Sequence, residues 1–505
     1  MNNKNKRRIT SPQSLNAYVK GICDIMRRSG RASALQYVPE LTWMLFLRIL
    51  DEIEEKEKEE TEALGYIYYP SLEYPFRWRD WADPEGKKRQ ELQNSTLGAY
   101  MNFVNVELIP YLKSLKNKPG ATSRQKVISE VFSYIERTGI DTERNLLDIL
   151  DRISELSIEN VDEKHMFTLS QVYEGLLQKM GEKNNDGGQF FTPREIIRVM
   201  VRVINPQIGE TVYDPCCGTG GFLAQAYQYM KEKASTATER ELLKTRTFYG
   251  REKEDLVYPI ALANLVLQGI DEPHIWHGNT LTGRETYGGL FIGAPQSYDV
   301  VLTNPPFGGK ESREAQTNFA YKTSSTQVLF LQHVMDSLKP GGKCGIVMDE
   351  GVLFRTNETA FVQTKRKLLN EFDLWCIVSL PPKVFVTAGA ASKTNLLFFT
   401  KGRPTKEIWY YDLSDINVTK KQPLTMEHFE EFFKLLPTRE ESERSWKVSI
   451  EEIIQKNYDL KAVNPNKKNH ADNRSPEELI SLIEEQNKIL LEAIEQIKGI
   501  LKKES

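Results

Sequence analysis

The amino-acid sequence predicts an α/β fold with a helical region on either side of it. Three observations support this prediction. Apolar residues follow a helical spacing in residues 11–160, short apolar runs alternate with helix-length segments in residues 161–420, and helical spacing returns after about residue 426. Such alternation is typical of a mostly parallel sheet with helices on both faces. Ligands of these sheets bind at the carboxyl ends of the strands.

Residues 1–160 are predicted to form an N-terminal helical domain. One of its helices is marked by apolar residues at helical spacing: Leu41, Met44, Leu45, Ile49 and Ile53. This helix runs into the acidic stretch Asp51–Glu62, which we interpret as a solvated helix end, with an interaction tail as the alternative. The aromatic, turn-rich stretch from Tyr66 to Glu85 predicts a loop between helices.

Residues 161–420 are predicted to form the α/β domain. Its expected strands are the short apolar runs Thr211–Tyr213, Thr247–Tyr249, Ile275–Trp276, Asp299–Leu302, Lys343–Met348, Leu374–Ser379 and Thr394–Thr400. Helix-length segments such as Phe222–Lys233 and Leu256–Gln268 lie between them.

Residues 421–505 are predicted to form a C-terminal helical region, interrupted by the polar stretch Asn464–Arg474. From about residue 476 to 503, apolar residues follow a heptad spacing: Ile480, Ile483, Leu490, Ile494, Ile497 and Leu501. Asn487 takes an a-type position in this register, which can fix the partner of a coiled coil. The pattern predicts a coiled coil with a partner, and a helix packed on its own chain is the alternative.

The overall charge argues against a chain that grips nucleic acid by itself. The 505 residues carry 67 Lys and Arg against 70 Asp and Glu, a formal net charge of -3. A broad phosphate footprint usually requires a basic protein. The five cysteines form no Cys-x-x-Cys pair, and we expect neither a disulfide framework nor a metal site. With no signal peptide or membrane span in the pattern, we expect a cytoplasmic protein.

A glycine turn follows the first expected strand, in the segment Val212–Phe222. Glycines let the backbone approach a nucleotide-like ligand because no Cβ stands in the way. Asp214 ends the strand, and Glu252 lies just past the end of the next one, where an acid suits a ribose diol. Tight helix–strand packing is the structural alternative for the turn, and an exposed surface acid is the alternative for Glu252.

A second turn, Asn304-Pro305-Pro306-Phe307, ends the buried strand Asp299–Leu302. The two prolines remove backbone donors and stiffen the turn, so that carbonyls are free to accept hydrogen bonds. Asn304 adds a side-chain carbonyl, and Phe307 adds a flat stacking face. Two acceptors aimed at one planar amine would raise the electron density on its nitrogen as it attacks an electrophilic carbon. A merely stiff proline turn is the alternative.

Together with Gly188-Gln189-Phe190-Phe191-Thr192-Pro193-Arg194, these two turns resemble the motifs of adenine-specific DNA methyltransferases. More narrowly, the chain resembles the modification subunit of type I restriction-modification systems, with the gamma-class order of motifs. The resemblance covers nearly the whole chain and implies a Rossmann-like S-adenosylmethionine-dependent methyltransferase domain. Methyltransferases of protein glutamine amides or RNA share the Asn-Pro-Pro-Phe turn and are an alternative, as is an inactive assembly module.

The resemblance also implies a role for each motif residue. The methionine end of S-adenosyl-L-methionine would be bordered by Gln189, Phe190, Phe191, Thr192, Pro193 and Arg194, and its amino-acid part would be held by Asp214, Gly218, Thr219, Gly220 and Gly221. Glu252 would bind the ribose hydroxyls, and Asn279, where Asp is commoner, the cofactor's adenine. Asn304, Pro305, Pro306 and Phe307 would receive a target adenine flipped from the duplex. Cys216 and Cys217 are interpreted as small buried fillers, with catalytic thiols as the alternative.

The resemblance implies partners as well. Only about a hundred residues follow the last expected strand, too few for a target recognition domain of ordinary size. No P-loop motif occurs, so ATP-driven translocation must belong to another chain. We therefore expect DNA, a specificity subunit with two copies of this chain, and a restriction/translocase subunit as partners. The polar segment 308–327 is predicted to be a mobile loop that closes on DNA, with a plain disordered surface loop as the alternative.

Overall fold

The computed structural model describes residues 12–29, 34–155, 192–287, 290–385, 393–419 and 422–466, together with residues 480, 484, 487 and 488. The chain divides into two compact units, Met1–Val463 and Asn464–Ser505. The architecture below concerns the first unit. Gln189, Phe190 and Phe191, and most of the predicted coiled coil at 476–503, lie outside the described residues.

A single ten-stranded sheet organises the first unit, in the order β10-β9-β7-β8-β6-β5-β1-β2-β3-β4. The strands are β1 Val212–Asp214, β2 Phe248–Glu252, β3 His274–Asn279, β4 Arg284–Tyr287, β5 Tyr298–Thr303, β6 Leu338–Asp349, β7 Phe372–Ser379, β8 Thr394–Lys401, β9 Glu407–Asp412 and β10 Ser445–Ser449. The central strands β6, β5, β1, β2 and β3 are parallel neighbours, whereas β4, β8 and β10 pair antiparallel. The predicted α/β class and all seven predicted strands are confirmed, and β4, β9 and β10 are additional.

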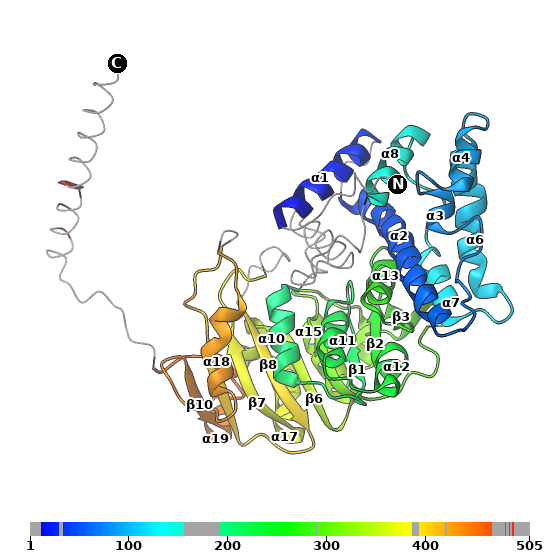
Figure 1. The fold of residues 1–505 in the computed structure, drawn as a ribbon. Coiled ribbons are helices and arrows are strands. Elements are labelled where there is room, and N and C mark those ends of the chain that lie inside the picture. Colours follow the sequence, from blue (N-terminus) through cyan, green and yellow to red (C-terminus); the bar gives the residue numbers. More distant parts are fainter. Residues whose placement is uncertain are drawn as a thin grey trace. The chain divides into compact units, whose positions relative to one another are not determined.

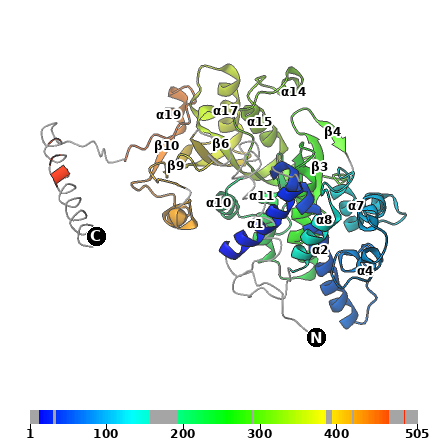
Figure 2. The same cartoon turned by 90° about the horizontal axis from the view of Figure 1, so that it is seen from above.

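Helices cover both faces of this sheet (Figures 1 and 2). Successive residues of a strand point to opposite faces, so Val300 and Leu302 of β5 join one core and Val301 joins the other. The first core includes helices α10 Arg194–Ile204, α11 Gly221–Lys231, α12 Ala237–Thr245, α13 Tyr258–Gln268 and α18 Glu430–Leu435. The second includes α15 Thr326–Ser337, α16 Glu350–Phe354, α17 Thr359–Glu371 and α19 Ile450–Gln455. Strands at the centre of the sheet, such as β1 and β5, are largely buried on both faces.

The N-terminal region is helical, as predicted. Its elements are α1 Pro12–Arg28, α2 Ala34–Ala63, α3 Trp78–Trp81, α4 Lys87–Gln93, α5 Ala99–Asn102, η1 Phe103–Leu108, α6 Ile109–Ser114, η2 Leu115–Asn117, α7 Ser123–Val131 and α8 Glu143–Ser154. The stretch Tyr66–Glu85 is mostly loop, with α3 within it. The acidic stretch 51–62 is only partly solvated. Glu54 is buried and accepts from the Ser71 N–H at 3.1 Å, and Glu57 pairs with Arg124 at 2.7 Å.

These N-terminal helices attach to the sheet through α13 and β3. Helices α2 and α7 both contact α13. Arg124 of α7 also pairs with Asp271 at 2.9 Å, just before β3. The Tyr134 hydroxyl lies 2.6 Å from Nδ1 of His277, a fully buried residue of β3. The helical region therefore braces the strand that ends at Asn279.

The prediction that the chain is helical from residue 421 onward is wrong at β10. This strand pairs antiparallel with β9 and extends the sheet at its edge. Trp446 and Tyr410 stack across the pair with ring centroids 5.2 Å apart, which stabilises the added strand. The helical elements η7 Met426–Phe429, α18 and α19 flank it. Among the described residues, no helix is both long and apolar enough to cross a membrane.

Candidate active site

The glycine turn connects β1 to α11. Gly218 and Gly220 have φ of 53° and 81°, in the left-handed region that L side chains rarely adopt. A Cβ on Gly220 would also lie 3.2 Å from the Leu265 side chain. Asn264 of α13 donates from Nδ2 to the Thr219 carbonyl at 2.9 Å, which fixes the turn from behind. The turn therefore packs tightly on α13 and also presents a face without Cβ atoms.

Asp214 ends β1 with its carboxyl group almost fully buried. Its Oδ1 accepts from the Thr303 hydroxyl at 2.7 Å and from the Cys216 N–H at 3.2 Å. Its Oδ2 accepts no hydrogen bond from the described part of the chain. Burial raises the pKa of Asp214 to about 7, although both donors oppose the rise. A cationic ligand at Oδ2 would stabilise the ionised form.

Glu252 ends β2 beside the glycine turn and is also buried. Oε2 accepts from the Gly218 N–H at 3.0 Å, and Oε1 accepts from the Lys253 and Glu254 N–H groups at 2.8 Å. Burial raises its pKa to about 7 against these donors. Because the carboxylate is bonded to the turn, the alternative of an exposed surface acid is wrong.

The Asn304-Pro305-Pro306-Phe307 turn follows β5. Asn304 donates from Nδ2 to the Thr192 hydroxyl at 3.0 Å, and its buried Oδ1 has no hydrogen-bond partner among the residues that the structure describes. The Pro305 carbonyl accepts from Gln327 at a long 3.4 Å. The Phe307 ring is half-buried and packs edge-on against Phe385, with centroids 5.4 Å apart. A buried acceptor without a donor is costly unless a ligand supplies one.

The fold brings these motifs together. Strands β1 and β5 are parallel neighbours, with Val212 opposite Val300, so their carboxyl ends meet at one edge of the sheet. Thr192 and Pro193 immediately precede α10 and reach the same place, through the contact of Thr192 with Asn304. Arg194 is the first residue of α10, and its surface is exposed.

Asn279, predicted to lie against an adenine ring, ends β3 at the same edge. Its Oδ1 accepts from the Leu281 N–H at 3.0 Å in a local turn. The neighbouring Thr280 hydroxyl donates to the Pro215 carbonyl at 2.6 Å and ties this turn to the glycine turn. Strand β3 pairs with β2, with His277 opposite Glu252. The site thus spans the ends of β5, β1, β2 and β3.

Of the two cysteines of the glycine turn, Cys217 is buried and Cys216 is partly buried. Burial raises the pKa of both Cys216 and Cys217 well above the usual range, so neither is a ready nucleophile. Cys217 packs under Gly250, where a Cβ would approach its Sγ to 3.1 Å. Cys216 is more than a filler, because its Sγ lies 3.1 Å from the Thr303 hydroxyl.

The segment 308–327 is internally bonded and contains the short helix α14, Arg313–Thr317. Lys310 and Ser325 form a β-bridge, and the Glu311 N–H donates to the Ser324 carbonyl at 2.8 Å. Asn318 donates to the Leu281 carbonyl at 2.9 Å, which fastens the segment near the end of β3. The alternative of a plain disordered loop is therefore wrong, and closure on DNA stays a prediction.

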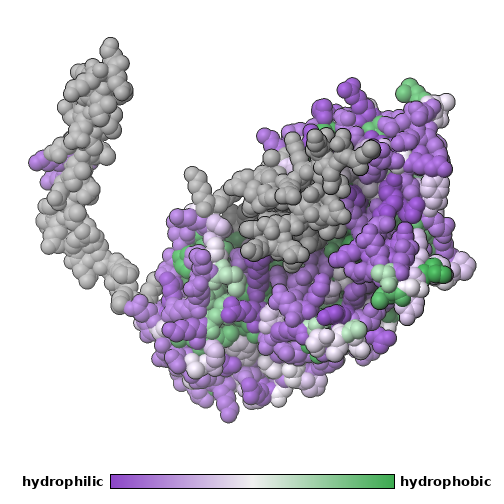
Figure 3. Space-filling view, in the orientation of Figure 1, coloured by the Kyte–Doolittle hydropathy of each residue, from purple (hydrophilic) through white to green (hydrophobic). Residues whose placement is uncertain are grey.

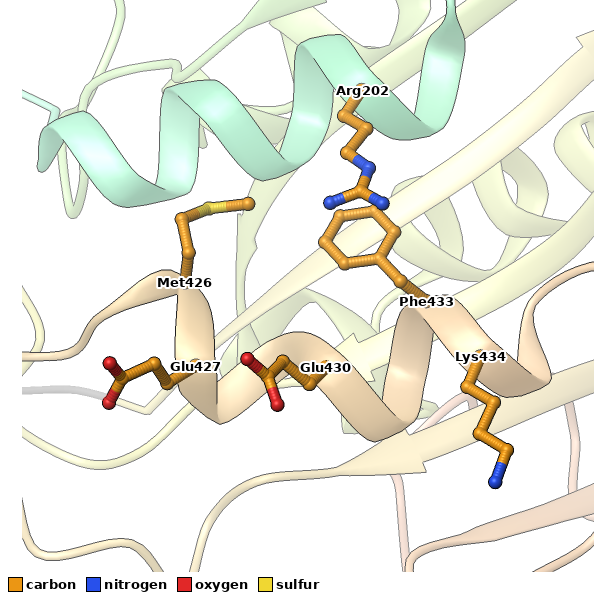
Figure 4. Close-up of a pocket in the computed structure, with 6 residues that line it drawn as sticks. All are labelled: Arg202, Met426, Glu427, Glu430, Phe433 and Lys434. Atoms are coloured by element: carbon orange, nitrogen blue, oxygen red, sulfur yellow. The ribbon is translucent and has the colours of Figure 1, made fainter.

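A hollow of about 380 Å³ lies between α10 and the η7–α18 segment (Figure 4). It is lined by Arg202, Met426, Glu427, Glu430, Phe433 and Lys434. The guanidinium carbon of Arg202 lies 3.9 Å from the centroid of the Phe433 ring, which pins α10 to α18. Around α18, Figure 3 shows hydrophobic residues within a largely hydrophilic surface. None of the predicted site residues lines this hollow.

Sequence reasoning missed four supporting residues: Asn264, His277, Thr303 and Gln327. Three are polar side chains inside apolar segments, and their role depends on contacts across the sheet that spacing along the chain does not reveal. Thr303 immediately precedes Asn304, so its position beside a predicted motif was the available signal. A β-branched residue at a strand end otherwise reads as ordinary strand composition.

Comparison with known proteins assigns the chain to a family. Residues 164–474 match the model of the N-6 DNA methylases. The chain belongs to this family. Residues 15–172 match the HsdM N-terminal domain, which corresponds to the helical region described above.

The similarity of this N-6 DNA methylase family member to known relatives extends over nearly the whole chain. It is 32% identical to the type I restriction enzyme EcoEI methylase subunit of Escherichia coli, over 97% of this chain and 98% of that one. It is 29% identical to the EcoKI methylase subunit of E. coli K12, over 81% of this chain and 74% of that one. The predicted membership of the type I modification subunits is confirmed.

A solved structure shares the fold. One chain, from a study of complex assembly and conformational transition of the type I R-M system, is 37% identical, with a TM-score of 0.73. The match covers 98% of this chain and 100% of that chain. The methyltransferase role expected from the motifs is thus supported by the sequence relatives, the family match and the fold.

Proposed function

We propose that this chain methylates the exocyclic amine of adenine in DNA, with S-adenosyl-L-methionine as the methyl donor. The observation that carries the proposal is the buried Oδ1 of Asn304, which lacks a hydrogen-bond partner among the described residues. It lies at the end of β5, next to the strand that ends at Asp214. An amine donor from a substrate would satisfy this acceptor.

The residues at the strand ends fit the cofactor. Oδ2 of Asp214 takes the ammonium of its amino-acid part, and the Cβ-free turn Gly218–Gly221 allows close backbone approach. Glu252 takes the ribose hydroxyls while it remains bonded to Gly218. Asn279 lies toward the adenine. The remaining cofactor contacts are proposed for the Gln189-to-Arg194 element, whose Thr192 touches Asn304.

The catalytic turn orients and activates the amine. When bound, the cofactor supplies a methyl group on a positively charged sulfur. Asn304 Oδ1 and the Pro305 carbonyl accept the two amine hydrogens, and Phe307 stacks on the flipped base. Acceptance of both hydrogens directs the nitrogen lone pair toward the methyl carbon. Pro306 keeps the turn rigid, so little reorganisation is needed at the moment of transfer.

The sequence reading is assigned to a partner. A net charge of -3 predicts weak DNA binding by the isolated chain. We propose that a specificity subunit binds two copies of this chain and supplies target recognition. A restriction/translocase subunit completes the assembly. The complex would act in the cytoplasm, where its DNA substrate lies.

The test is to co-express the chain with the product of a neighbouring specificity-type gene and assay methyl transfer from labelled cofactor. DNA, RNA and protein are offered separately, and the products are digested and analysed by mass spectrometry. N6-methyladenine should form in DNA, and only when both chains are present. Label on RNA or on glutamine, or cofactor binding without transfer to any of the three, would contradict the proposal.

A further inference from the structure

We propose that Thr303 is a positioning residue that couples the cofactor turn to the catalytic turn through one buried hydroxyl. The inference rests on the proposed function, because it takes Asp214 as the residue that binds the cofactor's amino group. It adds a residue that belongs to neither motif and assigns its side chain a specific task.

The hydrogen-bond directions around Thr303 follow from the chemistry of its neighbours. Thr303 is fully buried, and its single hydroxyl hydrogen points to Asp214 Oδ1 at 2.7 Å. An ionised carboxylate only accepts, so the hydroxyl must donate to it. Cys216 Sγ, 3.1 Å from the same hydroxyl, is then the donor. The thiol is available for this because burial keeps it protonated.

This chain of contacts joins two segments that are distant in sequence. Cys216 belongs to the glycine turn, Asp214 to the end of β1, and Thr303 to the end of β5. The next residue after Thr303 is Asn304, whose amide contacts Thr192 before α10. The hydroxyl therefore lies between the group that would hold the methyl donor and the group that would hold the acceptor.

The hydroxyl also sets the state of the Asp214 carboxyl. Both of its donors reach Oδ1, which leaves Oδ2 without a hydrogen-bond donor from the described residues. A donated hydrogen bond favours the ionised form, which is the form that binds an ammonium. Without the hydroxyl, burial would hold the carboxyl protonated to a higher pH.

Other ionisable groups lie near Asp214, and their titration must be distinguished from that of Asp214. They are the thiols of Cys216 and Cys217, the phenol of Tyr213 on β1 and the carboxyl of Glu252 on β2. Thr303 has a hydrogen-bond contact with Asp214 and with Cys216. A change in the pH dependence caused by Thr303 substitution would therefore be assigned to Asp214, because the Cys216 thiol stays protonated.

The experiment measures S-adenosyl-L-methionine affinity of the full chain by calorimetry between pH 6 and pH 9. Thr303→Val keeps the shape and removes the hydroxyl, whereas Thr303→Ser keeps the hydroxyl. At pH 7.5, Thr303→Val should weaken binding about tenfold or more, which is the effect of one lost bond to a charged group. Its binding midpoint should move to higher pH, and Thr303→Ser should remain within about threefold of the wild type.

A second pair keeps the test decisive if the valine variant does not fold. Thr303→Ser and Thr303→Ala differ only by the hydroxyl, so the same contrast in affinity and midpoint is expected between them. Cys216→Ala should change affinity by less than about threefold, because a thiol is a weak donor. Michaelis constants for the cofactor should rise more than kcat falls.

The outcomes separate the two proposals. A loss in Thr303→Val that is equal at every pH and is not restored by serine would overturn the positioning role, because it would indicate a packing defect. Unchanged affinity in Thr303→Val would overturn it as well. Failure of the wild-type chain to bind the cofactor at any pH would instead contradict the proposed function.

Discussion

The glycine turn and the proline turn follow the neighbouring strands β1 and β5, yet they differ in how far their polar groups are hydrogen-bonded by the protein. At the glycine turn, the Gly218 N–H donates to Glu252 of the neighbouring strand and the Thr219 carbonyl accepts from Asn264. In the proline turn, Asn304 Oδ1 is buried without a partner among the described residues. The backbone of the first turn is hydrogen-bonded by the protein, whereas the second turn keeps a buried side-chain acceptor for a ligand.

The difference teaches where preorganisation is needed. A cofactor that binds in every cycle is held by a rigid cradle, whose geometry the protein fixes in advance. A flipped base must supply its own donors, and an unmatched acceptor is the feature that selects an amine. Thr303 is bonded to the first turn and adjacent in sequence to the second, so the two halves of the site share one support.

The largest effect is expected from removing the unmatched acceptor. Asn304→Ala should lower the rate of methyl transfer by at least about a hundredfold, in the range seen when one preorganised polar group at a reacting centre is lost. Cofactor affinity should stay close to that of the wild type. Single-turnover methylation by the assembled complex and calorimetry with the cofactor would measure the two quantities.

Asn304→Asp serves as the matched control because it keeps an acceptor at the same place. It should retain more activity than the alanine variant. Equal activity of wild type and Asn304→Ala would remove Asn304 from the mechanism and would leave its buried oxygen unexplained.

A smaller effect is expected from Asp214→Asn, which should weaken cofactor binding but stabilise the ligand-free protein. The amide oxygen can accept from Thr303 and Cys216 as Oδ1 does, so the fold should be kept. At pH 8 the cofactor affinity should fall about tenfold or more, because the carboxylate that faces the ammonium is lost. Calorimetry at pH 8 would measure this loss.

The same substitution should stabilise the ligand-free protein relative to the wild type, although it weakens cofactor binding. The pKa of Asp214 is about 7 in the folded chain, against an ordinary value of 3.8. Between these values the folded state binds more protons than the unfolded state, so this group lowers the free energy of unfolding as pH rises. Relative to the wild type, Asp214→Asn should therefore gain stability from pH 4 to pH 7. Urea unfolding across this range that shows no such gain would contradict the raised pKa.

The sequence was sufficient for much of the fold because each predicted strand is a short, mainly apolar run separated from the next by a helix or a turn. It was insufficient at the sheet edge. Strand β10 is five residues long, and its alternation places Trp446 and Val448 on one side. Such a short pattern does not predict a strand by itself, because β10 is stabilised by pairing with β9, more than thirty residues earlier in the chain.

The site follows the same division. Asp214, Glu252 and Asn304 could be predicted because each is the polar residue of a motif at, or just past, the end of a strand. Thr303 could not, because its role depends on the neighbouring strand and on the direction of a hydrogen bond. Contacts between strands of a parallel sheet join residues far apart in sequence, and no local spacing records them.

The smallest effect is expected from the segment 308–327, which lies next to the proline turn. Lys310, Arg313 and Lys322 are exposed cations, and replacing all three by Ala should weaken binding of the complex to DNA about threefold to tenfold. The expected cause is lost phosphate contact, so the salt dependence of binding should also become shallower. Cofactor affinity should not change, because the described side-chain hydrogen bonds that leave the segment reach Leu281, Pro305, Gln332 and Asp349 rather than the glycine turn.

Lys367→Ala provides a control outside the segment, since this lysine pairs with Asp336 on α15 at 2.6 Å. Filter binding at several salt concentrations would separate a phosphate contact from a general loss of charge. If the triple variant binds DNA with the wild-type affinity and salt slope, the segment does not close on DNA. In that case the segment 308–327 does not cover the flipped base, and the base is held by the rigid proline turn and its neighbours alone.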